Sequence, residues 1–315
     1  MKTKAMFAIV LCLVAAAIIA QGKAQPQPVP EKQVTATEIP GVIAAGTKVE
    51  RVWTGLNAGD GLIAEPNGTL LLPEQGEANT ISRVDKNGKV TLYLEDTNEA
   101  GGVAIDPRRR IIDIERKPPS RIRLLVPERK VLADNFEGKP FQRLSDIVAD
   151  KKGGVWVTES PSGSVFYLGA DGKLSRPADH VKNANGIMLS PDEKTLYVTS
   201  GDAGVIAYDV QPDNTLKNRR PFAKPEGGVD GLAIDAAGRL YDCSNLGIQV
   251  LSPKGEHLGL IPIPRPTTTL AFAGPDKKTL YVIGRGNDGP GGNGQNARSM
   301  YKIAMIAQGY KGRPK

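Results

Sequence analysis

Two carboxylates and one amide stand at comparable places in this sequence, each followed by a glycine and an apolar run. They are Asp60 in DGLIA, Asn185 in NGIML and Asp230 in DGLAI. Three further segments carry Gly101 (GGVAI), Ser145 (SDIVA) and Thr268 (TTLAF) at the same place. The set offers carboxylate, amide and hydroxyl oxygens and contains no His or Cys. An all-oxygen set suits a hard cation, Ca²⁺ before Mg²⁺ or Mn²⁺.

Asp-Gly and Asn-Gly pairs are also common in tight turns, so one such pair alone would indicate nothing more than a loop. Here the pairs occur in register with a longer repeat. Each of the six positions lies nine to eleven residues before a strand-like segment. These six segments begin at residues 69, 110, 154, 195, 239 and 279. The successive starts are 41, 44, 41, 44 and 40 residues apart. A set in register favours a shared site over independent turns.

Each repeat has the features of a four-stranded antiparallel unit. An apolar stretch leads through a turn into the next strand, as in residues 186–200, where Pro191 and Asp192 favour a tight reversal. A second hairpin follows in most repeats, for example around Asn87-Gly88. Units of about 42 residues with four strands each are typical of propeller blades. The sequence therefore predicts an all-β, six-bladed β-propeller, with residues 48–53 completing the last blade and closing the ring.

The predicted fold explains why distant residues would meet. The innermost strand of every blade lines the central channel of a propeller, and residues at its start lie at one height around one mouth. Asp60, Asn185 and Asp230 should therefore converge there, with Gly101, Ser145 and Thr268 completing the ring of six positions.

The N-terminal residues have the pattern of a secretory signal peptide. Lys2 and Lys4 precede an apolar run over residues 5–20, and Gly22 and Ala24 follow. We expect a signal peptide over residues 1–24, a Pro- and Gln-rich disordered spacer over 25–45 and the propeller over 46–310. The mature protein would be periplasmic or secreted, with no membrane partner after cleavage.

Composition limits the other classes of function. The net charge of +7 includes Lys2, Lys4 and Lys23, so cleavage would leave +4. The arginines between residues 108 and 123 lack interleaved aromatic residues, which argues against nucleic acid as a partner. Cys243 alone would remain after cleavage, so no intramolecular disulfide is expected. No pattern in the sequence bears on oligomeric state.

Three segments resemble the SMP-30/gluconolactonase/LRE-like family of six-bladed propellers. They are residues 185–192 (NGIMLSPD), 230–235 (DGLAID) and 271–281 (AFAGPDKKTLY). The resemblance extends over about residues 50–304. It implies a metal-dependent, gluconolactonase-like hydrolase that opens a sugar lactone or another small lactone.

The resemblance also implies roles for single residues. The metal ligands would be Asn185, Asp230 and Asp60, the last in place of a Glu that the family has in the first blade. Asp230 would act as general base. Arg143 and Ser145 would contact the substrate, with Ser145 where the family often has an Asn. Ca²⁺ is the expected metal, and Zn²⁺, Mg²⁺ and Mn²⁺ are alternatives.

The departures at Asp60 and Ser145 keep a second class of function open. A non-catalytic exported propeller could bind a ligand or a protein on the same face, because fold alone does not establish function. Paraoxonase-like chemistry relies on histidines, and this chain has two, His180 and His257, which we expect on loops or turns. The chain contains no G-x-S-x-G motif, which excludes a serine hydrolase of that type.

Overall fold

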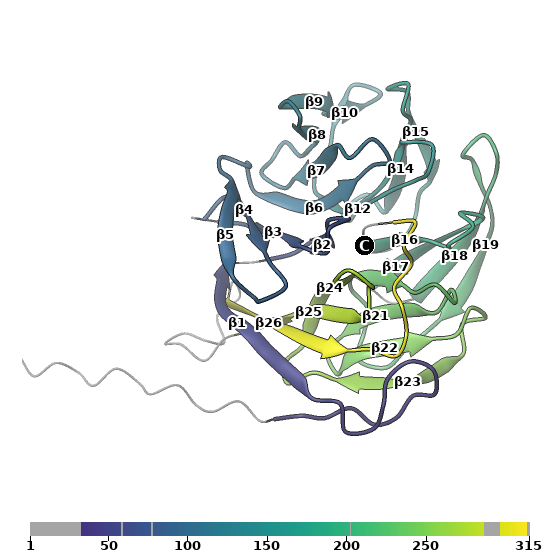
Figure 1. Ribbon diagram of the computed structural model, residues 1–315. Helices are drawn as coiled ribbons and strands as arrows, with labels where there is room; N and C mark the ends of the chain where they lie inside the picture. Colours follow the sequence, from purple (N-terminus) through teal and green to yellow (C-terminus); the bar gives the residue numbers. More distant parts are fainter. Residues whose placement is uncertain (1–32, 58, 77, 202, 287–296, 314–315) are drawn as a thin grey trace, which may run out of the picture.

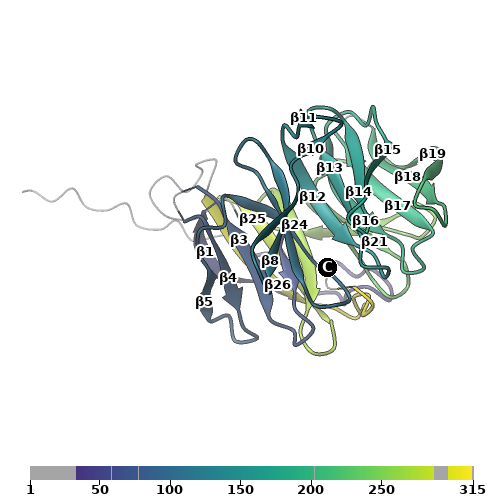
Figure 2. The ribbon, with the colours of Figure 1, turned by 90° about the horizontal axis from the view of Figure 1, so that it is seen from above.

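The computed structural model describes residues 33–57, 59–76, 78–201, 203–286 and 297–313. These residues form six four-stranded antiparallel sheets and one additional short hairpin. The sheets are arranged radially around a central axis (Figure 1). The view turned by 90° shows neighbouring blades beside one another (Figure 2). The predicted all-β fold with six blades of four strands is confirmed.

The strands follow the chain from blade to blade. Blade 1 contains β2 (Ile63–Ala64), β3 (Leu70–Glu74), β4 (Thr80–Val84) and β5 (Val90–Leu94). Blade 2 contains β6 (Ala100–Ile105), β7 (Ile111–Glu115), β8 (Arg121–Val126) and β9 (Lys130–Ala133). The short hairpin β10 (Asn135–Phe136) and β11 (Lys139–Pro140) leads to blade 3, with β12 (Leu144–Ala149), β13 (Val155–Glu159), β14 (Ser164–Leu168) and β15 (Leu174–Ala178).

The remaining blades repeat this order. Blade 4 contains β16 (Ala184–Leu189), β17 (Thr195–Ser200), β18 (Gly204–Val210) and β19 (Leu216–Ala223). Blade 5 contains β20 (Leu232–Ile234), β21 (Leu240–Ser244), β22 (Gly247–Leu251) and β23 (His257–Pro262). Blade 6 contains β24 (Thr267–Ala273), β25 (Thr279–Arg285), β26 (Ala297–Ala304) and β1 (Val49–Asn57).

The two ends of the chain close the ring in blade 6. Strand β1, from the N-terminal part, pairs antiparallel with β26, for example Val49 with Ile303 and Thr54 with Ser299. The predicted closure by residues 48–53 is therefore confirmed, with a strand that extends to Asn57. Because the last blade takes strands from both ends of the chain, opening the ring requires the loss of a complete strand pair.

Turns that begin with a short polar residue connect the inner strand of a blade to its second strand. Asp235 Oδ1 accepts hydrogen bonds from the amides of Ala237 and Arg239, both at 2.9 Å. Asp106 and Asp150 bind the backbone of their own turns in the same way. The side chain thus replaces a backbone acceptor and favours a sharp reversal, as Asx-turns do.

The hydrophobic core lies between the faces of adjacent blades. One cluster joins blades 2 and 3 through Ile114 and Val157, and another joins blades 1 and 6 through Leu72 and Ile283. The strands nearest the channel are nearly fully buried, whereas outer strands such as β19 are largely exposed. Each blade therefore needs its neighbours to bury its faces.

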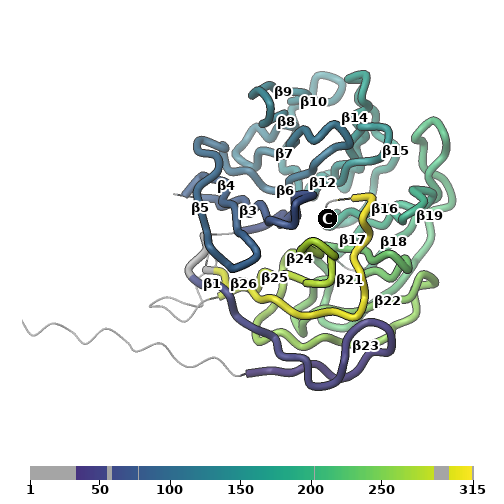
Figure 3. The backbone as a smooth tube through the Cα atoms, in the orientation of Figure 1, coloured from purple at the N-terminus to yellow at the C-terminus, as the bar shows by residue number. Residues whose placement is uncertain are grey.

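Residues 33–48 pack against the outside of blades 5 and 6, beside β23 (Figure 3). Val42 and Ile43 are completely buried, and Ile39 and Ile43 form a β-bridge. This packing differs from the disordered spacer expected over residues 25–45, because Ala36, Ile39, Val42 and Ile43 bury apolar surface. The predicted signal peptide, residues 1–24, lies outside the described residues. The described part of the chain contains no helix with the length and apolar character needed to span a membrane.

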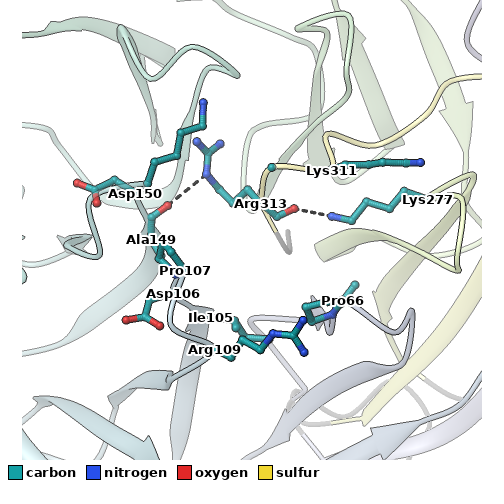
Figure 4. Close-up of a pocket in the computed structure, with 13 residues that line it drawn as sticks. Pro66, Ile105, Asp106, Pro107, Arg109, Ala149, Asp150, Lys277, Lys311 and Arg313 are labelled. Atoms are coloured by element: carbon teal, nitrogen blue, oxygen red, sulfur yellow. Dashed lines mark hydrogen bonds between the residues drawn. The ribbon is translucent and has the colours of Figure 1, made fainter.

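The C-terminal segment crosses one mouth of the channel and ends at the centre of the ring (Figure 1). The Arg313 guanidinium is buried and donates to the carbonyl oxygens of Ala149 (3.2 Å) and Leu189 (2.8 Å), and it pairs with Glu193 at 2.8 Å. Lys277 Nζ donates to Tyr310 O at 3.1 Å. These contacts tie the tail to blades 3, 4 and 6. Figure 4 shows the hydrogen bonds that join Arg313 to Ala149 and to Lys277.

Candidate functional site

The six predicted ring positions occupy the start of the inner strand in each blade. Asp60 and Asp230 lie just before β2 and β20, and the other four lie at irregularities in strand pairing. Pairing shifts between Ala184 and Ile187, around Asn185, and between Leu144 and Ile147, around Ser145. The same shift surrounds Gly101 and Thr268. β-bulges re-aim side chains next to functional sites.

Ring positions of consecutive blades touch one another. Gly231 N donates to Thr268 O at 3.0 Å, and Thr199 Oγ1 donates to Asp230 O, also at 3.0 Å. A Cβ at Gly186 would collide with the Asp230 carbonyl, so the glycine after Asn185 permits this close approach. The ring positions of blades 4, 5 and 6 therefore lie side by side at the mouth opposite the C-terminal tail.

Asp60, Asn185 and Asp230 are brought together at this mouth. Asn185 Nδ2 donates to Asp230 Oδ1 at 2.7 Å. The Asp230 side chain is 16% exposed and that of Asp60 is 27% exposed. Burial and the nearby Asp60 carboxylate together raise the pKa of Asp230 to about 7, although Arg285 and Arg116 lower it. The two carboxylates are thus close enough to repel each other.

Two arginines neutralise these carboxylates. Arg116 donates from Nη1 to Asp60 Oδ2 and from Nη2 to Ser145 O, both at 2.8 Å. Arg285 donates from Nη2 to Asp230 Oδ2 at 3.1 Å. A Cβ at Gly101 would lie only 2.5 Å from Arg116 Nε. The ring position without a side chain therefore makes room for the Arg116 guanidinium.

The two predicted substrate-binding residues have different environments. Arg143 is exposed, and its guanidinium makes no hydrogen bond to a residue that the structure describes. Partial burial and Arg116 lower the pKa of Arg143, while Asp60 and Asp230 raise it, which places Arg143 beside the two carboxylates. Ser145 is 3% exposed and its Oγ is buried without a hydrogen-bond partner. The substrate contact of Ser145 stays a prediction.

The oxygen atoms of the ring fit the chemistry of a divalent cation. Asp60 Oδ1 and Asn185 Oδ1 receive no hydrogen bond from the described residues, and the buried hydroxyls of Ser145 and Thr268 are also unpaired. No group of three or more His, Cys, Asp or Glu side chains suited to a metal occurs among the described residues. The candidate set combines two carboxylates with an amide, and its ligand roles stay predictions.

The structure adds three arginines that the sequence reasoning missed: Arg116, Arg285 and Arg298. Arg116 follows the end of β7, and Arg285 stands at the equivalent position in blade 6, directly after Gly284. The repeat alignment that identified the ring could therefore have revealed both. Arg285 lies within a glycine-rich stretch, which predicts a loop and by itself indicates no role for the arginine's charge.

A separate cavity of about 290 Å³ lies at the opposite mouth (Figure 4). Its lining includes Asp150, Lys277, Lys311 and Arg313, and none of the six ring positions. Asp106 and Asp150 at its edge are engaged in their own turns. The ring residues and this cavity are thus on opposite sides of the molecule.

Comparisons with known proteins agree with the fold. A model of the SMP-30/Gluconolactonase/LRE-like region matches residues 59–284. A gluconolactonase from Zymomonas mobilis is 26% identical over 262 residues, which cover 70% of this chain and 74% of that protein. Pentonolactonase XacC from Haloferax volcanii is 31% identical over 186 residues, which cover 53% of this chain and 64% of that protein.

Two solved structures show the same architecture. A gluconolactonase from Xanthomonas campestris has a TM-score of 0.73 at 23% identity and covers 88% of this chain and 95% of its own. Regucalcin from Agrobacterium tumefaciens, described as a calcium-binding protein, has a TM-score of 0.67 at 18% identity. The match covers 82% of this chain and 94% of that protein. At these identities the structural likeness shows the fold.

Proposed function

Because the chain belongs to the SMP-30/gluconolactonase/LRE-like family, we propose that it is a metal-dependent lactone hydrolase that acts at the mouth carrying Asp60, Asn185 and Asp230. The observation that carries this proposal is the convergence of these three side chains from blades 1, 4 and 5. The names of the relatives, gluconolactonase and pentonolactonase, support a lactone as substrate.

The cation would be held by Asp60, Asn185 and Asp230, with Ca²⁺ as the first candidate because all three supply oxygen. When bound, such a cation polarises a carbonyl oxygen as a Lewis acid. Arg116 orients Asp60 through its hydrogen bond to Oδ2, and Asn185 orients Asp230 through Oδ1. The chain thus positions both carboxylates before a ligand arrives.

Asp230 is the candidate general base. Its pKa of about 7 lies near neutral pH, where a carboxylate can both accept and release a proton. Asp230 would take a proton from the attacking water, whose oxygen bonds to the carbonyl carbon. The ring C–O bond then breaks, and the ring oxygen leaves as a hydroxyl with that proton. Arg143 would bind polar groups of the substrate.

The test is hydrolysis of δ-gluconolactone by the protein, measured with and without chelator. We expect turnover that chelator abolishes and added Ca²⁺ restores. Asp230→Asn should lower kcat by about 100-fold or more, because it removes the base while keeping the side-chain shape. Asp171→Asn, at an exposed hairpin turn, is the matched control and should keep full activity. Full activity of Asp230→Asn would exclude the assigned role of this residue.

One observation favours the second candidate, a non-catalytic binding propeller. Arg116 and Arg285 each occupy one carboxylate oxygen of the proposed metal ligands. If these ion pairs persist in solution, a lactone panel should show no turnover and Ca²⁺ should not change the melting temperature. A rise in melting temperature with Ca²⁺, without turnover, would indicate a metal-binding propeller that is not an enzyme.

A further inference from the structure

We propose that Thr158 and Thr199 are positioning residues of the proposed active mouth, and that their hydroxyl groups fix the directions of the Asn185 and Asp230 side chains. Each threonine lies on the second strand of one blade and acts on the ring position of the next blade. The inference rests on the proposed metal-dependent function, because it names the residues that prepare two of the proposed ligands for a cation.

Both threonine hydroxyls form hydrogen bonds from one blade to the next. Thr158 is the penultimate residue of β13, and its Oγ1 donates to Asn185 O at 2.5 Å. Thr199 is the penultimate residue of β17, and its Oγ1 donates to Asp230 O at 3.0 Å. Both threonines are completely buried, where a hydrogen bond is electrostatically stronger than in water.

The contacts of the Thr158 hydroxyl determine where its hydrogen points. The amide of Asp146 donates to Thr158 Oγ1 at 3.1 Å. A threonine hydroxyl has a single hydrogen to donate, and two carbonyl oxygens lie within its reach. Asn185 O is nearer to Oγ1 than Asp146 O, which is 3.4 Å away. The hydroxyl therefore accepts from its own blade and donates to the next one.

Asn185 and Asp230 lie where the inner strands lack regular pairing. Pairing of β16 with β17 is interrupted between Ala184 and Ile187, and Asp230 precedes β20. The threonine hydroxyls thus take the place of a ladder partner for these two backbone carbonyls. Because the backbone orientation of a residue sets the direction of its Cα–Cβ bond, the same contacts direct Asn185 Nδ2 toward Asp230 Oδ1, at 2.7 Å.

Packing alone does not require a hydroxyl at this place in a blade. The equivalent residues of the other four blades have none, and they are Pro73, Ile114, Cys243 and Ile283. The two blades with threonine directly precede the blades that carry Asn185 and Asp230. Asp60 follows the blade with Ile283 around the ring, and it is held by Arg116 of blade 2 instead. Each of the three proposed ligands is therefore held by a side chain of a neighbouring blade.

The first experiment measures Ca²⁺ binding by calorimetry in valine and serine variants of both threonines. Valine keeps the branched shape and removes the hydroxyl, whereas serine keeps the hydroxyl. Thr158→Val and Thr199→Val should each weaken Ca²⁺ binding by about tenfold or more, as loss of the groups that orient metal ligands does. Thr158→Ser and Thr199→Ser should bind Ca²⁺ with nearly wild-type affinity. Serine variants as weak as the valine variants would contradict a role of the hydroxyl.

Thr267→Val is the matched control. Thr267 is also buried, and its Oγ1 accepts from the amide of Ser244 at 2.9 Å and donates to the carbonyl of the same residue at 3.0 Å. Its hydroxyl contacts none of the proposed ligands. Urea denaturation should show a loss of stability similar to that of the other valine variants, with unchanged Ca²⁺ affinity. An equal fall in Ca²⁺ affinity in all three valine variants, or in none, would overturn the inference.

A second measurement needs no metal and separates this inference from the proposed function. Proton–nitrogen NMR spectra report the Nδ2–H pair of Asn185, assigned by its absence in Asn185→Asp. We expect hydrogen exchange of the proton bonded to Asp230 to be about tenfold faster in Thr158→Val and Thr199→Val than in the wild type. Equal exchange rates would refute the positioning role even in an active lactonase. If the wild type neither binds Ca²⁺ nor hydrolyses a lactone, the proposed function fails, and the exchange rates still decide the role of the two threonines.

Discussion

Asp60 and Asp230 lie close to positively charged arginine side chains. The balance between these negative and positive charges determines what the site can bind. Arg116 is more buried than Arg285, with 11% of its side chain exposed against 53%, and it bonds directly to Asp60. Its guanidinium and a divalent cation would therefore compete for the same carboxylate. Gly101 is essential to this arrangement, because a side chain there would displace Arg116.

This competition gives a prediction for Arg116→Met. Removal of the guanidinium leaves the Asp60 carboxylate without its partner, so Ca²⁺ should bind more tightly, by about tenfold. Gly101→Ala should act in the same direction because its Cβ meets the Arg116 side chain. Calorimetric titration with Ca²⁺ measures the change, and Arg108→Met, in the exposed loop between β6 and β7, is the control. Weaker Ca²⁺ binding in both variants would mean that the positioning of Asp60 by Arg116 outweighs its competition with the metal.

At the scale of elements, blade 2 contains a buried ion-pair network between β7 and β8. Arg123 pairs with Glu115 at 2.8 Å and with Asp113 at 3.2 Å, and all three side chains are nearly inaccessible to solvent. Arg123→Met would leave the buried Asp113 carboxylate without a cation and Glu115 with Arg121 alone, at 3.7 Å. Loss of one partner of a buried pair costs about 3–5 kcal/mol of stability. Urea denaturation would detect this loss, and Arg121→Met, on the same strand with an exposed side chain, should change stability far less.

Asp113 in the same network gives a pH prediction. Burial raises its pKa to about 7, although Arg123 lowers it. The folded state therefore retains a proton between about pH 4 and pH 7 that the unfolded state releases near pH 4. The unfavourable contribution of Asp113 to the free energy of unfolding is absent below about pH 4. It grows as the pH rises to about 7 and then stays constant. Wild type should thus lose stability relative to Asp113→Asn over this interval. A constant difference between the two proteins from pH 4 to pH 7 would contradict the raised pKa.

At the scale of the whole molecule, two separate sets of contacts, one near each end of the chain, hold the blades together in a ring. Strand β1 pairs with β26 within blade 6, and the C-terminal tail connects blades 3, 4 and 6 at one mouth. The tail therefore lies opposite the proposed active mouth. Its contacts stabilise the ring without any contact to the ring positions Asp60, Asn185 or Asp230.

The tail contacts predict the effect of Arg313→Ala. The substitution removes hydrogen bonds from a buried guanidinium to two blades and leaves Glu193 without this partner. We expect a loss of about 2–4 kcal/mol in the free energy of unfolding. Lys311→Ala, on the same tail with an exposed side chain, should have little effect. Equal denaturation midpoints for the two variants would mean that the tail does not hold the blades together.

The repeat carried most of the information about the fold. Strand-like segments 40–44 residues apart predicted six blades, and the β1–β26 closure followed from the segment left over before the first repeat. The meeting of Asp60, Asn185 and Asp230 was also predictable, because equivalent positions in a ring converge whatever their distance in sequence. The signal peptide, the bound metal and the role of Asp230 as a base stay predictions.

Tertiary structure alone decided which charges surround those residues. The ion pairs of Arg116 with Asp60 and of Arg285 with Asp230 join residues 56 and 55 positions apart. The packing of Val42 and the insertion of Arg313 likewise depend on partners in distant blades. Local patterns report the period and polarity of a strand, but the direction of a long side chain depends on the space left by its neighbours. The sequence by itself thus determined the scaffold and the ring, and three-dimensional packing determined the electrostatics of the site.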